Sequence, residues 1–152
     1  MHLTHRFLIA GLVALAACAD SSPTEAKTHV GTYLLQSAAG QPAPAIIHSL
    51  IDEASGQSIV LLLLGDTLEV HADGTYIQHA RLELRVDGVF TGRSRWSDHG
   101  IYSLHGSDIH FESEYLENIA FDGRLASGAV ITLTQNLAGE GTDDEYVLAR
   151  HP

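Results

Sequence analysis

Residues 67–84 read TLEVHADGTYIQHARLEL, and this stretch decides the fold class. Apolar and polar residues alternate on both sides of a short turn, which is the pattern of a β-hairpin with one buried face. A three-residue loop that ends with Gly74 in the left-handed conformation pairs Val70 with Tyr76 and collects the apolar side chains on one face, with Gln78 as the polar exception. A two-residue loop would shift the pairing by one residue and divide these side chains between two faces. We therefore predict the three-residue loop, with this buried face: Leu68, Val70, Tyr76, Ala80, Leu82, Leu84 and Val86.

The same period of two continues along the chain and is interrupted by glycine-containing turns. A tight turn at His105-Gly106 pairs Tyr102 with Ile109, and a loop over residues 126–128 pairs Leu125 with Ala129. Successive hairpins form an antiparallel meander, and closing it into a barrel removes its exposed edges. The sequence predicts an all-β, up-and-down barrel of roughly eight strands. The expected strands span Val30–Gln36, Ser58–Leu64, Thr67–Ala72, Thr75–Val86, Val89–Ser97, Gly100–Leu104 with Asp108–Ser113, Ile119–Leu125 with Ala129–Gln135, and Glu145–Arg150.

Two stretches depart from this alternation. Residues 45–56 place four apolar side chains at helical spacing between Pro44 and Gly56. This stretch is therefore either a short helix near 46–55 that lies across one barrel mouth, or an edge strand. Residues 59–64 form a continuous apolar run whose outward side must be covered. Either the preceding segment or a loop covers this run, or the run is a patch that meets a partner or the membrane.

The N-terminal segment has the features of an export signal. A cationic start precedes an uncharged stretch from Phe7 to Ala17, which is too short for a membrane-spanning helix. The tetrad Leu15-Ala16-Ala17-Cys18 resembles the bacterial lipobox, in which the cysteine receives a diacylglyceryl group and becomes the new N-terminus. This resemblance implies that residues 1–17 are a signal peptide and that Cys18 is the lipidation site. Ala19 after the cysteine favours the periplasmic face of the outer membrane, by the sorting rule of enteric bacteria.

Composition limits the partners of the remaining chain. Residues 19–28 are polar and predict a flexible tether, which leaves residues 29–152 as the folded domain. The chain has 8 Lys+Arg against 19 Asp+Glu and a net charge of −11, which argues against binding nucleic acid or anionic headgroups through charge and favours a cationic partner. Cys18 is the only cysteine, so the domain has no disulfide and depends on its core for stability.

Several short motifs resemble those of small bacterial lipocalin-like lipoproteins. They are Gly31-Thr32-Tyr33-Leu34-Leu35, Gly40-Gln41-Pro42, Asp73-Gly74-Thr75-Tyr76, Gly100-Ile101-Tyr102 and Tyr146-Val147-Leu148-Ala149-Arg150. In lipocalins a Gly-x-Trp motif opens the first strand, and a terminal arginine stacks over the tryptophan to close the base of the barrel. Here Tyr33 replaces that tryptophan, and Arg150 is the candidate barrel-closing residue. The resemblance implies an up-and-down barrel whose apolar interior holds a small hydrophobic molecule.

The inward-facing residues of such a barrel are bulky, and they either fill the interior or leave a pocket. The candidate pocket lining is Tyr33, Tyr76, Leu82, Leu84, Phe90, Tyr102, Phe111, Phe121 and Tyr146. The other expected inward residues are Leu35, Leu68, Val70, Ile109, Leu125, Ile131, Leu133 and Leu148.

Candidate metal ligands lie on a predicted outer face. In the expected register His99 lies opposite Glu112 with His110 beside them, and these three residues could hold Zn²⁺, although their spacing matches no known metal motif. His71 and His79 are weaker candidates. The acidic turn over residues 139–145 lacks the ligand spacing of a Ca²⁺ loop and predicts a solvated hairpin tip. No catalytic constellation emerges, so we expect neither enzyme activity nor a cofactor.

Two functions fit the sequence. The first is a membrane-anchored carrier that binds a small hydrophobic molecule inside the barrel. The second is an interaction module of the cell envelope, such as a hydrolase inhibitor or a structural lipoprotein. An apolar cavity open at one end favours the carrier, whereas a filled barrel with a protruding segment favours the interaction module.

Overall fold

The computed structural model describes residues 29–115, 120–126, 129–137 and 144–152. This part of the chain consists of ten β-strands and contains no helix, so the all-β prediction is confirmed. The predicted signal peptide, Cys18 and the tether lie outside the described residues, as does most of the acidic turn. The strands are β1 (Gly31–Ala38), β2 (Gln41–Pro42), β3 (Ala45–Ile51), β4 (Ser58–Val70), β5 (Thr75–Val86), β6 (Val89–His105), β7 (Asp108–Ser113), β8 (Ala120–Ala126), β9 (Val130–Gln135) and β10 (Asp144–Arg150).

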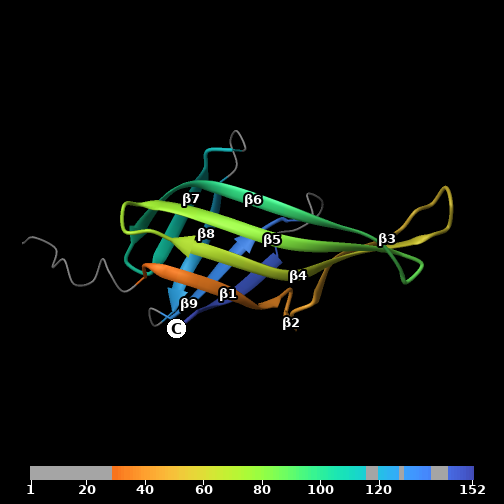
Figure 1. Cartoon of the computed structure of the whole chain (residues 1–152), viewed down its shortest axis with the longest axis horizontal. Helices are drawn as coiled ribbons and strands as arrows, with labels where there is room; N and C mark the ends of the chain where they lie inside the picture. The colour runs from red at the N-terminus through yellow and green to blue at the C-terminus, as the bar shows by residue number, and fades with distance from the viewer. Residues whose placement is uncertain (1–28, 116–119, 127–128, 138–143) are drawn as a thin grey trace, which may run out of the picture.

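Eight of the strands close into an antiparallel barrel (Figure 1). From β4 to β10 each strand pairs with the next, and β1 closes the barrel by pairing with β10 on one side and with β4 on the other. The two additional strands, β2 and β3, pair with β1 and with the first half of β4. The up-and-down barrel implied by the resemblance to lipocalin-like lipoproteins is therefore present.

The β4–β5 hairpin has the predicted register, with Val70 opposite Tyr76. Gly74 has a φ of +88°, a conformation that glycine adopts without the steric cost of a side chain. Asp73 stabilises the loop, because its Oδ1 accepts hydrogen bonds from the amide of Thr75 at 3.1 Å and from the hydroxyl of Thr75 at 2.7 Å. The alternation on both sides of the loop correctly identified the buried face.

Two later hairpins differ from the prediction by two residues. Tyr102 pairs with Phe111 instead of Ile109, because the tight turn lies one position further along the chain. Leu125 pairs with Ile131, two positions beyond its predicted partner. Side chains alternate with a period of two, so a shift of two residues leaves each of them on its predicted face. The buried faces are therefore correct, and the cross-strand partners are wrong.

Residues 45–51 form the edge strand β3, so the helix considered for 46–55 is wrong and the alternative of an edge strand is correct. β3 pairs with β4 through a bulge between Ile46 and His48. A bulge adds one residue to a strand and resets its alternation. Before the bulge the strand alternates normally, with Ile46 at 43% exposure and Ile47 buried at 8%, and the reset after it gives the apolar residues a spacing that resembles that of a helix.

Four strands continue past the barrel and form a projection, the blade, on the right of Figure 1. The blade comprises residues 45–51, 58–64, 81–86 and 89–95 of β3, β4, β5 and β6. β4 pairs with β1 only near its C-terminal end and with β3 over its first half, while β6 pairs with β7 only from Gly100 onward. β4 and β6 have 13 and 17 residues, and each replaces two separate predicted strands. The apolar run over residues 59–64 of β4 therefore has β3 beside it in the sheet, and β3 does not cover either face of the run.

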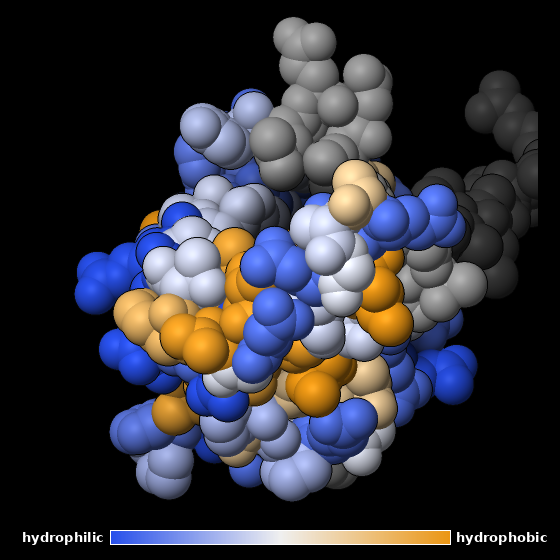
Figure 2. All heavy atoms as spheres, turned by 90° about the vertical axis from the view of Figure 1, so that its right-hand side faces the viewer, coloured by the Kyte–Doolittle hydropathy of each residue, from blue (hydrophilic) through white to orange (hydrophobic). Residues whose placement is uncertain are grey.

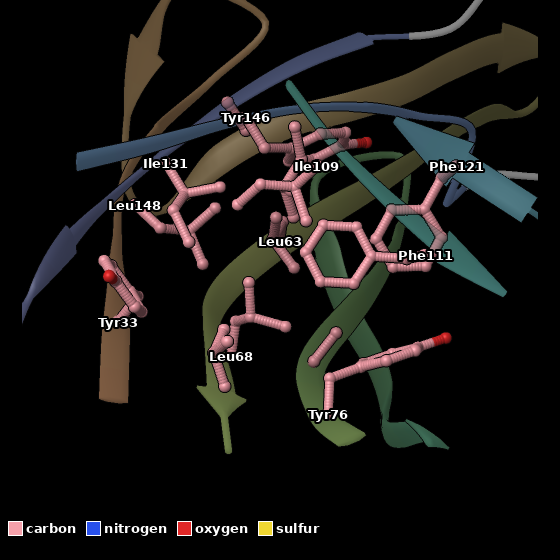
Figure 3. Packing of buried hydrophobic residues seen from close by; sticks show 14 of the residues in the cluster. Tyr33, Leu63, Leu68, Tyr76, Ile109, Phe111, Phe121, Ile131, Tyr146 and Leu148 are labelled. Carbon is pink, nitrogen blue, oxygen red and sulfur yellow. The ribbon is translucent and has the colours of Figure 1, made fainter. Parts of the chain in front are cut away.

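The barrel interior is packed with large side chains from most of its strands (Figure 3). The rings of Phe111 and Phe121 are stacked with their centroids 4.7 Å apart, and Tyr76 meets both edge-on, at 5.0 and 5.7 Å. Such aromatic contacts add about 0.5–1.5 kcal/mol per pair to the free energy gained by burial. The buried cluster comprises Tyr33, Ala38, Ala45, Ile47, Leu63, Leu68, Val70, Tyr76, Ala80, Ile109, Phe111, Phe121, Ile131, Leu133, Tyr146 and Leu148.

Candidate functional site

The predicted pocket lining divides between the barrel and the blade. Leu82 and Tyr102 are half-buried and pack against the core, whereas Leu84 and Phe90 are 36% and 55% exposed on the blade. The prediction that Leu84 and Phe90 face the barrel interior is wrong for two reasons. Alternation does not mark the point where a strand leaves the barrel, which explains Leu84, and a bulge pairs Phe90 with Arg85 on the opposite face of the blade. The buried members of the predicted lining are Tyr33, Tyr76, Phe111, Phe121 and Tyr146.

A polar cluster lies inside the barrel among these apolar side chains. Gln78 Nε2 donates hydrogen bonds to Asp66 Oδ2 at 2.6 Å and to Gln135 Oε1 at 3.0 Å, and all three residues are buried. Burial raises the pKa of the Asp66 carboxyl to about 7, although hydrogen bonds from Gln78 and from the backbone of Thr67 oppose this rise. The signal in the sequence was Gln78, the polar exception on an apolar face, and its partners were not predicted.

A second buried carboxylate lies next to this cluster. Asp98 accepts hydrogen bonds from the hydroxyl of Tyr76 at 2.6 Å and from the hydroxyl of Ser113 at 2.5 Å. Asp98 also pairs with Gln78 across the β5–β6 ladder, so the two polar groups belong to one region of the interior. Hydrogen bonds of this kind offset the cost of burying polar groups in an apolar core.

The end of the barrel where β1 begins is closed by a different set of contacts. The hydroxyl of Tyr33 donates to the carbonyl of His29 at 2.7 Å, and His29 Nε2 lies 2.9 Å from the hydroxyl of Tyr102. Burial lowers the pKa of the His29 imidazole, and the nearby charge of Arg150 lowers it further. Arg150 lies opposite Tyr33 in the β1–β10 ladder, and its guanidinium donates to the carbonyl of Val30. The candidate barrel-closing arginine is thus placed beside Tyr33.

The candidate zinc ligands are not brought together. The two-residue shift in register moves His99 away from Glu112, and His99 instead contacts the ring of Tyr115, with centroids 6.4 Å apart. His110 Nδ1 lies 2.7 Å from Asp122 Oδ1 and its Nε2 lies 3.8 Å from Glu112 Oε1. Within the described ranges, no three His, Cys, Asp or Glu side chains form a group that could hold a metal ion.

Three hollows lined by described residues lie away from the aromatic core. Two of them, of about 500 and 390 Å³, lie along β7–β8 and along β8–β10. The third, of about 260 Å³, lies where the blade joins the barrel and is lined by Leu64, Arg81, Leu82, Arg93, Ser94 and Arg95. None of the three includes Tyr76, Phe111 or Phe121, so none is the interior pocket that the resemblance implies.

Most of the exposed large apolar side chains in the described residues lie on the blade. Figure 2 looks onto this end of the molecule and shows hydrophobic atoms gathered between hydrophilic ones. One blade face continues the barrel interior, with Leu50, Ile59 and Val86 as neighbours on three strands. The exposed side chains on the blade are Ile46 at 43%, Leu50 at 36%, Ile51 at 69%, Leu84 at 36%, Val89 at 67% and Phe90 at 55%, and those elsewhere are Ile101 and Tyr115.

The opposite face of the blade holds a buried acid between two arginines. Glu83 is 4% exposed, and its carboxylate accepts hydrogen bonds from Arg85 Nε at 2.9 Å and from Arg93 Nε and Nη2 at 3.1 Å. These bonds, that from Arg85 first, hold the pKa of Glu83 below its ordinary value. The guanidinium carbon of Arg93 also lies 5.5 Å from the centroid of the Phe90 ring. This network fixes the positions of charged and aromatic side chains on one exposed surface.

The arginines are concentrated on the same two strands. Arg81, Arg85, Arg93 and Arg95 lie on β5 and β6, and the other basic residues within the described ranges are Arg124 and Arg150. The whole chain carries a net charge of −11, so the arginine-bearing parts of β5 and β6 differ in charge from the rest of the protein. Composition alone did not show this separation, because residues distant in sequence meet only across the β5–β6 ladder.

No protein-family model, curated protein or solved structure matches the chain. In the described parts of the chain, no helix has the length and apolar character needed to cross a membrane.

Proposed function

We propose that this protein is an exported lipoprotein, anchored through Cys18, whose blade docks on an apolar, acid-rimmed surface of a partner protein in the cell envelope. The observation that carries this proposal is the coincidence, on one projection, of most of the exposed apolar side chains and most of the arginines. Contiguous exposed apolar patches mark interaction sites. Arginine and aromatic side chains are also enriched among the residues that dominate binding energy at protein interfaces.

The charge of the blade supports an acidic rim on the partner. On the face that carries them, the four arginines surround one buried acid, Glu83, so this face of β5 and β6 has an excess of positive charge, while Asp52, Glu53 and Asp87 lie in the turns at the blade tip. A like-charged partner would be repelled, whereas acidic groups around an apolar centre would complement both the arginines and Phe90. The carboxylates of the barrel lie away from this contact and keep the rest of the surface acidic.

The strand edges of the blade offer a further mode of contact. β3 contains no charged residue and pairs only with β4, so its outer side is a sheet edge. The outer edge of β6 instead carries Arg93 and Arg95, and charged side chains are a common protection against unwanted pairing. An extended segment of the partner could therefore add to β3, where backbone hydrogen bonds supplement the apolar contacts of Ile46 and Ile51.

The barrel itself supports the interaction module over the carrier. Tyr76, Phe111 and Phe121 are in mutual contact and occupy the interior where a hydrophobic ligand would lie. A short tether of about ten residues, at roughly 3.5 Å each, would keep the domain close to the membrane surface. The partner is therefore expected to be an envelope protein.

Photocrosslinking in a bacterium that exports the full chain tests this function. A photoreactive side chain at Phe90 or at Ile51 is expected to yield the same discrete protein adduct, because both positions lie on the blade. The matched control is Tyr115, which is 68% exposed but lies off the blade. Equal adducts from Tyr115, or adducts only with lipid or with a second copy of the chain, would contradict the proposal.

A pair of charge variants tests the acidic rim. Ile51 is 69% exposed, so both Ile51→Asp and Ile51→Lys should fold normally, which thermal unfolding will show. Both variants lose apolar contact, but the aspartate also repels acidic groups on the partner. We expect Ile51→Asp to reduce the adduct formed from position 90 more than Ile51→Lys does. The reverse order would show that the partner surface is not acidic.

A further inference from the structure

The hollow where the blade joins the barrel is lined by several positively charged side chains. It measures about 260 Å³, and three arginines, Arg81, Arg93 and Arg95, contribute to its lining together with Ser94. Its size is below the roughly 300–1,000 Å³ of sites for drug-sized ligands, so it suits a small group. Leu64 and Leu82 complete the lining and give it an apolar side.

Arg81 and Arg95 lie directly opposite each other across the β5–β6 ladder. Like charges in this position destabilise a strand pair, by roughly 0.2–1 kcal/mol in ordinary cases. Neither side chain has an ion-pair or hydrogen-bond partner among the described residues, although acidic residues outnumber basic ones in the chain by 19 to 8. Arg93, in contrast, is engaged with Glu83. Two arginines thus line the hollow without an acidic partner.

Gly65 makes room for one of these charges. A Cβ atom at this position would lie 2.8 Å from Arg81 Nη2, so the absence of a side chain lets the guanidinium lie against the backbone of β4. The bulge in β4 between Leu63 and Gly65 falls at the same point. The position of the Arg81 guanidinium therefore depends on the local backbone and not on an acidic partner.

We propose that this hollow binds a phosphate monoester group, with the guanidinium groups of Arg81 and Arg95 as its principal ligands. Guanidinium groups bind phosphate with two parallel hydrogen bonds, and a phosphate monoester carries a charge of about −1.5 to −2 at neutral pH, which matches two unpaired arginines. A carboxylate would neutralise only one of them. Leu82 and Ser94 form the adjacent pair in the ladder, so alternation directs their side chains to the other face of the sheet and leaves the two guanidinium groups as the charged donors of the site.

The net negative charge of the whole chain argued against binding anionic headgroups. The hollow differs from the chain as a whole, because three arginines contribute to its lining. The phosphate group belongs either to a free molecule or to the headgroup of a lipid such as phosphatidic acid. The proposal does not depend on docking at the blade tip, since Arg81 and Arg95 lie at the blade root.

Titration of the full chain in neutral detergent tests the site, with inorganic phosphate and with water-soluble dihexanoyl phosphatidic acid as probes and dihexanoyl phosphatidylcholine as the diester control. Isothermal titration calorimetry is expected to show saturable binding of at least one phosphate monoester and none of phosphatidylcholine. Binding of inorganic phosphate identifies the source as a free phosphate, and binding of phosphatidic acid alone identifies it as a headgroup. Failure of both probes to bind would overturn the proposal.

Four variants locate the site. Arg81→Gln and Arg95→Gln are each expected to weaken binding about tenfold or more, because each removes a charged bidentate donor. Gly65→Ala keeps every charge but displaces the Arg81 guanidinium, so it should also weaken binding. The matched control is Arg124→Gln, since Arg124 is exposed and bonded to Asp108 on another part of the barrel. Equal weakening by Arg124→Gln would show that binding is unspecific and would overturn the assignment.

The same variants give a readout that is independent of binding. Removing one of two facing charges should leave the thermal unfolding temperature of Arg81→Gln and Arg95→Gln unchanged or raise it. Phosphate should raise that temperature in the wild-type chain and in Arg124→Gln, but not in Arg81→Gln. If phosphate raised the unfolding temperature equally in the wild type, Arg124→Gln and Arg81→Gln, the phosphate site would be contradicted. That result would leave the proposed docking of the blade on a partner protein unaffected.

Discussion

Replacing Asp66 by asparagine is expected to remove a loss of stability that the wild-type chain undergoes as the pH rises between about pH 4 and pH 8. Burial raises the pKa of this carboxyl from 3.8 to about 7, so the folded state holds its proton more tightly than the unfolded state does. The stabilising contribution is therefore complete below pH 3.8 and is lost as the pH rises through about 7. At about 1.4 kcal/mol per pKa unit, the difference between the two values sets an upper limit of about 4.5 kcal/mol on this loss in the free energy of unfolding.

Urea unfolding of the wild-type chain and of Asp66→Asn across this pH range is the assay. Asparagine keeps the shape of the side chain and an oxygen that accepts from Gln78, but it cannot ionise. The wild-type chain should lose stability relative to the variant as the pH rises. The control is Asp108→Asn, an exposed acid with 68% side-chain exposure, whose profile should follow that of the wild type. Parallel profiles for the wild type and Asp66→Asn would refute the assignment of a raised pKa to this buried group.

Other predictions concern the core, the backbone, the anchor and the barrel interior. Tyr76→Phe removes a hydroxyl that donates to the buried carboxylate of Asp98 at 2.6 Å, and it should lower the free energy of unfolding by about 1–3 kcal/mol in urea titrations. Gly100→Ala would drive a Cβ atom into the backbone carbonyl oxygen of Glu112, so it should destabilise the barrel by about 1–3 kcal/mol or more. Gly92→Ala, with no atom within 4 Å of the new Cβ, should leave the unfolding midpoint nearly unchanged. Cys18→Ser should release the protein from the membrane fraction, and a membrane-bound variant would contradict lipid anchoring. Native mass spectrometry of the full chain should show the mass of the lipidated protein alone, whereas a retained hydrophobic molecule would favour the carrier.

The sequence identified the hairpins because their signals are local. The turn before Gly74 and the alternation on both sides of it specify a register in which Val70 faces Tyr76, and the structure has that register. At the turn after Tyr102 the register was wrong by two residues, since two neighbouring turn positions satisfy the same alternation. In the observed register His99 is not opposite Glu112, so the zinc hypothesis loses its basis.

The polar cluster inside the barrel shows a different limit. Gln78 was visible as a polar residue on an apolar face, yet nothing in the sequence indicated that Asp66 and Gln135 would meet it there. Gln135 lies 57 positions away in the chain, and barrel closure is what brings the two side chains to 3.0 Å. A buried amide predicts that partners exist but does not identify them.

The all-β meander and the buried face of most barrel strands both follow from the sequence alone, because each strand carries a period of two locally. Only the tertiary structure decided where the barrel ends. Closure depends on β1 pairing with one half of β4 while β3 pairs with the other, and no local pattern records how a strand divides between two partners. That division leaves Leu84 and Phe90 on an exposed blade, and the β5–β6 ladder that it extends places Arg81 beside Arg95. The surfaces proposed here for binding are therefore products of long-range pairing.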